Sequence, residues 1–92
     1  MSEEDEREQA KLRLSLLEVV LAALDRRAEV VETVWESRDR ADAAERLRVL
    51  LGLPAGTPAE VVLDLQVGRF TAERRQALAR EVADLRQTLR TR

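Results

Sequence analysis

The stretch that decides the fold is residues 12–35, which read LRLSLLEVVLAALDRRAEVVETVW. Apolar residues recur along it at alternating steps of three and four, and they are Leu14, Leu17, Leu21, Leu24, Ala28, Val31 and Trp35. This spacing keeps one apolar stripe on one side of a helix and suits packing against a second helix. We therefore expect one long helix over residues 10–36, with Trp35 as a packing anchor. The acidic residues 1–9 are expected to be a frayed start.

A second helix with the same period is expected near the other end of the chain, over residues 71–91. Thr71 is a suitable residue to cap its N-terminus. Its apolar stripe consists of Leu78, Val82, Leu85 and Leu89. Two helices with matching stripes, joined by a short helical segment, can return as an antiparallel pair.

The two stripes predict a register for this pair. Stepping outward in heptads from Trp35 beside Arg74 or Arg75 places Leu78 opposite Val31 and Leu89 opposite Leu21. The first helix then extends past the end of the second. Its N-terminal part is left without cover in the same chain, which predicts a second contact there with another chain. The candidate residues for this contact are Leu12, Leu14 and Leu16.

Residues 38–70 contain the turn signals. Asp39 is a good N-cap for a helix that should end at Gly52 in a left-handed conformation. Thr57, followed by Pro58, is typical of a helix start, with Glu60 bonding back to the cap. This short helix is expected to end at Gly68. We expect residues 38–70 to form a helical knob of two short helices.

The composition supports an all-α fold of a single domain over residues 1–92, built as a coiled-coil hairpin of two long antiparallel helices with the knob between them. Aromatic residues are only 2% of the chain, so the core must come from Leu, Val and Ala. The chain has no Cys, which excludes disulfides and thiolate metal sites. No apolar run approaches the roughly 20 residues of a membrane span. We expect a soluble, cytoplasmic protein.

Several segments, in the same order along the chain, resemble the coiled-coil and exit-gate segment of the A subunits of bacterial DNA gyrase and topoisomerase IV. The segments are Ala23-Leu24-Asp25, Leu51-Gly52-Leu53, Val62-Leu63-Asp64-Leu65 and Arg69-Phe70-Thr71. In that family two long antiparallel helices end in a knob, and two knobs meet across a two-fold axis. The resemblance implies that residues 38–70 are the knob. It also implies that apolar residues shared between the knob core and a dimer face are Leu50, Leu53, Val61, Val62, Leu65, Val67 and Phe70.

The function expected from these patterns is a non-catalytic homodimerising module with no cofactor and no metal. The family it resembles cleaves DNA with a Tyr nucleophile, and this chain contains no Tyr. Nothing in the sequence places the carboxylates Asp25, Glu60 and Asp64 together as a catalytic pair needs. By resemblance, a gyrase or topoisomerase subunit is a further candidate partner.

Two alternatives stay open on the sequence alone. One is a small helical nucleic-acid-associated protein, because residues 69–92 contain seven Arg against three acids. Arg80, Arg86 and Arg90 are its candidate phosphate contacts. The other is a small all-helical enzyme such as chorismate mutase, although Lys11, the one Lys, lies near the start of the first helix.

Overall fold

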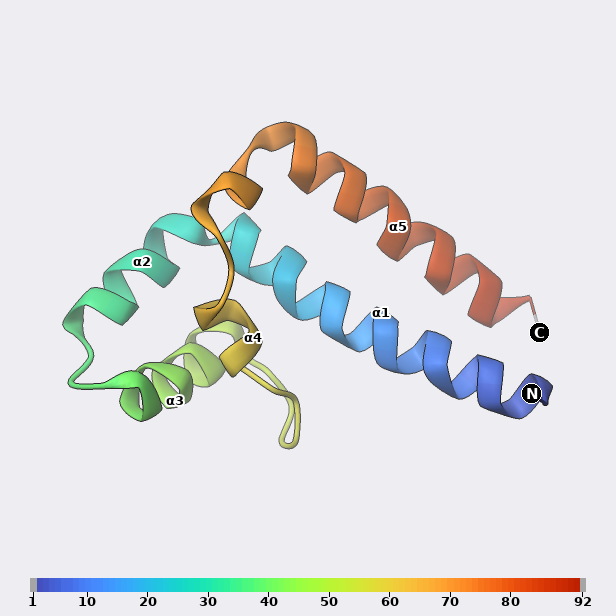
Figure 1. The fold of residues 1–92 in the computed structure, drawn as a ribbon, viewed down its shortest axis with the longest axis horizontal. Helices are drawn as coiled ribbons and strands as arrows, with labels where there is room; N and C mark the ends of the chain where they lie inside the picture. Colours follow the sequence, from blue (N-terminus) through green and yellow to red (C-terminus); the bar gives the residue numbers. More distant parts are fainter. Residues whose placement is uncertain (1, 92) are drawn as a thin grey trace.

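The computed structural model describes residues 2–91, and this part of the chain is helical with no strand. Its helices are α1 (Glu3–Asp25), α2 (Arg27–Glu36), α3 (Arg40–Leu51), α4 (Glu60–Leu63) and α5 (Ala72–Arg90), with a 3-10 helix, η1, at Val67–Phe70 (Figure 1). The all-α class expected from the sequence is confirmed.

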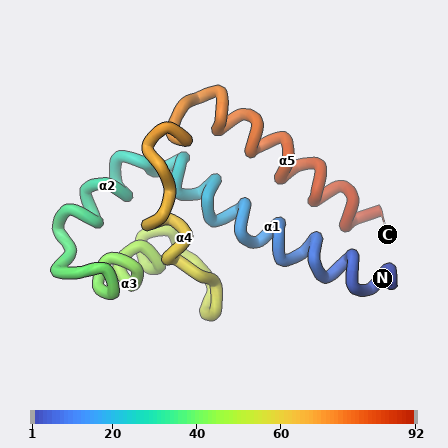
Figure 2. The backbone as a smooth tube through the Cα atoms, viewed as in Figure 1, coloured from blue at the N-terminus to red at the C-terminus, as the bar shows by residue number. Residues whose placement is uncertain are grey.

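The expectation of one continuous first helix is wrong, because the helix is divided at Arg26. This residue has φ −123° and ψ 35°, outside the helical region, and the chain changes direction there (Figure 2). Its guanidinium bonds both carboxylate oxygens of Glu29, at 2.8 and 2.7 Å, and donates to the backbone carbonyl of Leu50. The last carbonyls of a helix lack partners within it, so Arg26 satisfies one at the end of α3. The bend is held by this side chain, which an apolar period cannot reveal.

The acidic start of the chain is helical from Glu3 onward rather than frayed. The Ser2 hydroxyl accepts a hydrogen bond from the backbone N–H of Asp5 at 3.2 Å, which caps α1. Acidic residues fill the first turn, where negative charge stabilises the helix dipole. Met1 lies outside the described residues.

Three of the expected helix ends are confirmed. The Asp39 carboxylate accepts from the backbone N–H of Asp42 at 2.9 Å and caps α3. Gly52 ends α3 with φ 63°, a left-handed conformation that Gly adopts without steric penalty. Thr71 accepts from the backbone N–H of Arg74 at 3.2 Å and caps α5.

The expected short helix from Thr57 to Gly68 is wrong at both ends. α4 begins at Glu60 with no side-chain cap, and neither Thr57 nor Glu60 forms the expected capping bonds. Gly68 lies inside η1 instead of ending a helix. The physical reason is packing, because Ala59 is fully buried and fixes the segment against the core. Arg48 also holds the loop by donating to the carbonyl of Thr57 at 2.6 Å.

The core lies where α1, α2, α3 and α4 meet. It is built around Leu47, which is 0% exposed. The buried cluster consists of Val19, Ala23, Val30, Ala44, Leu47, Ala59 and Val62. Small side chains predominate, so the helices approach closely without any large aromatic residue.

α5 lies beside α1, and both chain ends are at the same end of the molecule (Figure 1). Arg75 binds Asp25 at 2.8 and 3.1 Å, and Arg86 binds Glu18 at 2.6 Å. Nearer the ends of the chain, Arg7 donates to the carbonyl of Leu89 at 2.8 Å. A further ion pair joins Arg13 and Glu81.

The register expected from the heptads is therefore wrong. Arg75 lies beside Asp25 and not beside Trp35, and Leu89 lies near Ala10 and Leu14 instead of Leu21. α4 packs on α1, so the chain returns at the bend and not at the far end of α2. α5 consequently reaches the first turns of α1, and the expected N-terminal overhang does not exist.

Candidate interaction surface

The outer side of α2 is an uncovered apolar surface, which we call the α2 face and define as Ala28, Val31, Val34 and Trp35. Trp35 is 83% exposed and Val31 is 59% exposed. Residues three and four apart lie on one side of a helix, so these side chains are neighbours. On the opposite side of α2, Val30 is buried in the core.

The apolar stripe that continues from α1 into α2 has two different environments. In α1, Leu14, Leu17 and Leu21 are half-buried and Leu24 is buried. On α5, Val82 is buried and its neighbours Leu78, Leu85 and Leu89 are half-buried. Beyond the bend, Ala28, Val31 and Trp35 are exposed. The expected role of Trp35 as a packing anchor is wrong, because α5 begins beside Asp25 and never reaches Trp35.

Most of the residues expected at a dimer face of the knob serve the protein's own core. Val62 is buried, and four others pack partly buried against the core cluster, namely Leu50, Leu53, Val61 and Leu65. Phe70 is half-buried. Val67, at 79% exposed, is the member of the set that projects fully into solvent.

The three leucines expected at a second contact are separated by the structure. Leu14 is half-buried and lines a groove with Leu89, between α1 and α5. Leu12 and Leu16 are exposed, Leu12 to 62%. They remain exposed apolar residues. α5 lies beside this part of α1, so they are not on an overhang.

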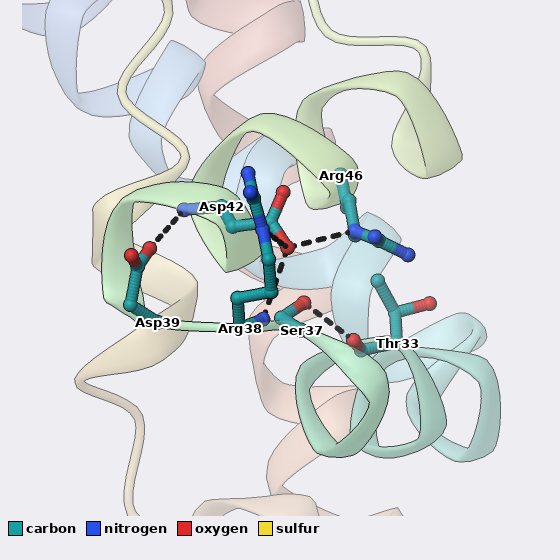
Figure 3. A network of polar contacts seen from close by, with 6 residues as sticks. All are labelled: Thr33, Ser37, Arg38, Asp39, Asp42 and Arg46. Carbon is teal, nitrogen blue, oxygen red and sulfur yellow. Dashed lines mark hydrogen bonds and ion pairs between the residues drawn. The ribbon is translucent and has the colours of Figure 1, made fainter.

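A polar network fixes the connection between α2 and α3 (Figure 3). The Ser37 hydroxyl donates to the carbonyl of Thr33 at 2.7 Å. One oxygen of Asp42 accepts from the backbone N–H of Arg38 and from Nε of Arg46, both at 3.0 Å. The Arg38 N–H, and more weakly the Arg46 guanidinium, lower the pKa of the Asp42 carboxyl. The α2 face is therefore presented from a helix whose end is held in place.

A groove runs beside the α2 face, between α2 and α3. It is lined by Thr33, Glu36, Glu45, Arg46, Val49 and Leu50. Val49 of α3 is 75% exposed at this groove. The sequence patterns do not single out Val34 or Val49. Val34 could have been identified because it lies three residues after Val31, on the same side of the helix. The helical period gives no such indication for Val49.

Two charged residues flank the α2 face. Within residues 2–91, the side chain of Glu32 forms no hydrogen bond or ion pair. Arg27 donates one hydrogen bond, from Nη1 to the carbonyl of Leu24 at 3.1 Å. Both side chains are exposed.

The other sites considered from the sequence are used within the fold. Asp25 pairs with Arg75, whose guanidinium lowers the pKa of the Asp25 carboxyl, and Asp64 pairs with Arg40 at 2.8 Å. Glu60 is exposed at the start of α4. Across the described residues, no group of three His, Cys, Asp or Glu is placed to hold a metal ion. In that same part of the chain, no helix is both long and apolar enough to cross a membrane.

The arginines of α5 are partly neutralised by α1. Arg86 pairs with Glu18, and Arg75 pairs with Asp25. Arg80 is exposed, and Arg90 bonds Gln87 at 3.3 Å. Arg92 lies outside the described residues. The pairing reduces the cationic surplus that an interaction with phosphate requires.

Comparisons with known proteins give no family for the chain. No protein-family model matches the sequence, and no curated protein matches it.

Proposed function

We propose that the protein is a non-catalytic module that forms homodimers. In this proposal α1 and α5 form an antiparallel coiled-coil hairpin, and residues 38–70, which contain α3 and α4, form the knob, as in the gyrase A gate segment that the sequence resembles; α2 joins the hairpin to the knob. The observation that carries the proposal is the α2 face, where the one Trp of the chain stands 83% exposed among Val and Ala. Contiguous exposed apolar surface marks interaction sites, and buried Trp residues are frequent energetic centres of interfaces.

The size of the surface indicates the strength of the dimer. Burying one large apolar side chain contributes about 1.5–3 kcal/mol. Association costs roughly 4–15 kcal/mol in lost freedom of motion, so a few side chains from each copy support only modest affinity. We expect a dissociation constant on the order of 10–100 μM, and hence a dimer that dissociates on dilution.

The single Trp makes the test direct. Sedimentation and Trp fluorescence are measured over a dilution series from about 1 mM, well above the expected dissociation constant. The proposal predicts a concentration-dependent dimer and a shift of the emission to shorter wavelength as Trp35 leaves water. Trp35→Ala should give a monomer. The matched control is Val67→Ala, which removes an equally exposed apolar side chain from the knob and should leave the dimer intact.

Two outcomes contradict the proposal in different ways. A wild-type protein that stays monomeric across the series means that it is not a homodimerising module. A dimer that survives Trp35→Ala but is lost in Val67→Ala places the interface on the knob, where the family resemblance would put it.

The family resemblance also supports a second proposed partner, the A subunit of a gyrase or topoisomerase. The α2 face would then contact the corresponding segment of the larger subunit. Mixing the protein with a purified gyrase A subunit should give a complex in sedimentation that Trp35→Ala abolishes. Unchanged sedimentation of both proteins in the mixture would contradict this partner without affecting the homodimer.

A further inference from the structure

We infer that the partner of the α2 face is a second copy of this chain lying parallel and in register, and that Arg27 and Glu32 select this arrangement. The inference rests on the proposed homodimer and specifies its geometry. In the dimer, Ala28, Val31 and Trp35 each lie opposite the same residue of the other copy.

The positions of the charges on α2 favour this geometry. Ala28, Val31 and Trp35 follow steps of three and four, so they occupy the a, d and next a positions of a heptad. Arg27 directly precedes the first of them and takes a g position, and Glu32 follows Val31 and takes the e position. In parallel helix pairs, a g residue lies beside the e residue of the following heptad on the other helix. Arg27 thus meets the partner's Glu32, and symmetry forms this ion pair twice.

An antiparallel pairing lacks these contacts. Antiparallel helices bring e positions beside e positions and g positions beside g positions. Glu32 would then lie beside the partner's Glu32, and like charges at close range are unfavourable. Neither of the two ion pairs between Arg27 and the partner's Glu32 would then form.

Both charged side chains are available for the contact. The Glu32 side chain is exposed and has no hydrogen bond or ion pair within residues 2–91. Arg27 uses Nη1 toward the Leu24 carbonyl, which leaves further N–H donors of its five free for a carboxylate. Its nearest acid in sequence, Asp25, already binds Arg75 through both carboxylate oxygens.

A disulfide test distinguishes the two orientations, because the chain contains no Cys. In the parallel dimer the two copies of residue 28 are neighbours, so Ala28→Cys should oxidise to a covalent dimer. Antiparallel helices pack a positions against d positions, so an antiparallel dimer that pairs Val31 with the partner's Trp35 holds the two copies of residue 28 about 15 Å apart along the helices. A disulfide tolerates no more than about 7 Å between Cα atoms. Val67→Cys, on an exposed site of the knob, is the control and should oxidise much more slowly.

The outcome separates this inference from the proposed function. If Ala28→Cys sediments as a dimer yet does not oxidise faster than Val67→Cys, the parallel arrangement is overturned and the homodimer stands. If Ala28→Cys is monomeric under conditions where the wild type dimerises, the substitution itself has disturbed the face, and charge variants decide the question. If the wild type is also monomeric, both proposals fail.

Charge reversal provides that second test and leaves the apolar face untouched. Arg27→Glu places an acid beside the partner's Glu32 in a parallel dimer, so the dissociation constant should rise about tenfold or more. Glu32→Arg should have the same effect, and an equimolar mixture of the two variants should recover wild-type affinity. Both residues are exposed, so circular dichroism should show unchanged helix content. Unchanged affinity of Arg27→Glu would overturn the parallel arrangement.

Discussion

The two halves of the long apolar stripe, one in α1 and one in α2, share a period but not an environment. In α1 the stripe faces α5, and ion pairs such as Arg75–Asp25 and Arg86–Glu18 join the two helices along their length. In α2 the stripe faces solvent, and Trp35 is the most exposed large apolar residue of the described chain. A helical period indicates which side of a helix is apolar. The path of the rest of the chain decides whether that side is covered.

The bend at Arg26 produces this difference. It directs α2 toward α3, where Val30 enters the core, and turns the α2 face away from α5. Three substitutions test how differently the two regions are supported. The first should change the stability most and the third least.

Leu47→Ala should have the largest effect, because it removes a fully buried side chain at the point where α1, α2, α3 and α4 meet. Cavity formation predicts a loss of about 2–5 kcal/mol in the free energy of unfolding, measured by urea denaturation. The matched control is Val49→Ala on the same helix, where 75% exposure predicts a change within about 0.5 kcal/mol. Equal losses in the free energy of unfolding for both variants would mean that the buried Leu47 stabilises the fold no more than the exposed Val49 does.

Asp39→Ala should have an intermediate effect. It removes the cap of α3 at the connection that holds the end of α2, and N-cap loss costs about 0.5–2 kcal/mol. Ser2→Ala removes the corresponding cap of α1, at a chain end where opening of the first turn is cheap. We expect a clearly larger drop in thermal midpoint for Asp39→Ala. A larger drop for Ser2→Ala would show that the α1 end is the better-ordered region.

Asp25→Asn should have the smallest effect, about 0.2–1 kcal/mol at pH 7, because its ion pair with Arg75 is partly exposed and screened by solvent. Arg75 lowers the pKa of Asp25 in the folded protein. A lowered folded pKa gives a contribution that is present above the unfolded value of about 3.9 and is lost as pH falls through the folded value.

Urea denaturation at pH 7 and near pH 2.5 checks the sign of this effect, since the lower pH lies below the unfolded carboxylate range. The wild type should lose more stability on acidification than Asp25→Asn does. Asp42, whose pKa is also lowered, stays in both proteins and contributes to the loss that they share. An identical pH dependence for the two proteins would show that the Asp25–Arg75 pair does not stabilise the fold.

Local chemistry was sufficient to predict much of the secondary structure. Asp39 and Thr71 cap the starts of α3 and α5, and Gly52 caps the end of α3, as expected, because a cap depends on residues within one turn of it. Thr57 failed as a cap because burial of Ala59, a tertiary effect, placed the start of α4. The same distinction applies to the bend, where Arg26 binds a carbonyl of a helix that lies far along the chain.

The exposed apolar residues of the stripe were predicted only in part: Leu12 and Leu16 are exposed as expected, and the exposed α2 face was not expected. Heptad matching aligned Leu78 with Val31 because it assumed an unbroken helix. Once the helix bends at Arg26, α5 lies beside α1, and Val31, Val34 and Trp35 of α2 are left exposed. Val67 and Trp35 show why sequence could not decide exposure, since both belong to apolar patterns that were expected to pack.

The placement of both chain ends together has a practical consequence for how the protein can be joined to other molecules. The outer ends of α1 and α5 lie at the end of the molecule opposite α2 (Figure 1). The 23 residues of α1 form a rod about 35 Å long at 1.5 Å per residue. A fluorophore, a tag or a fused domain attached at either terminus is therefore held at a rod's length from the α2 face. The structure thus separates the outer ends of α1 and α5 from the α2 face by the length of α1.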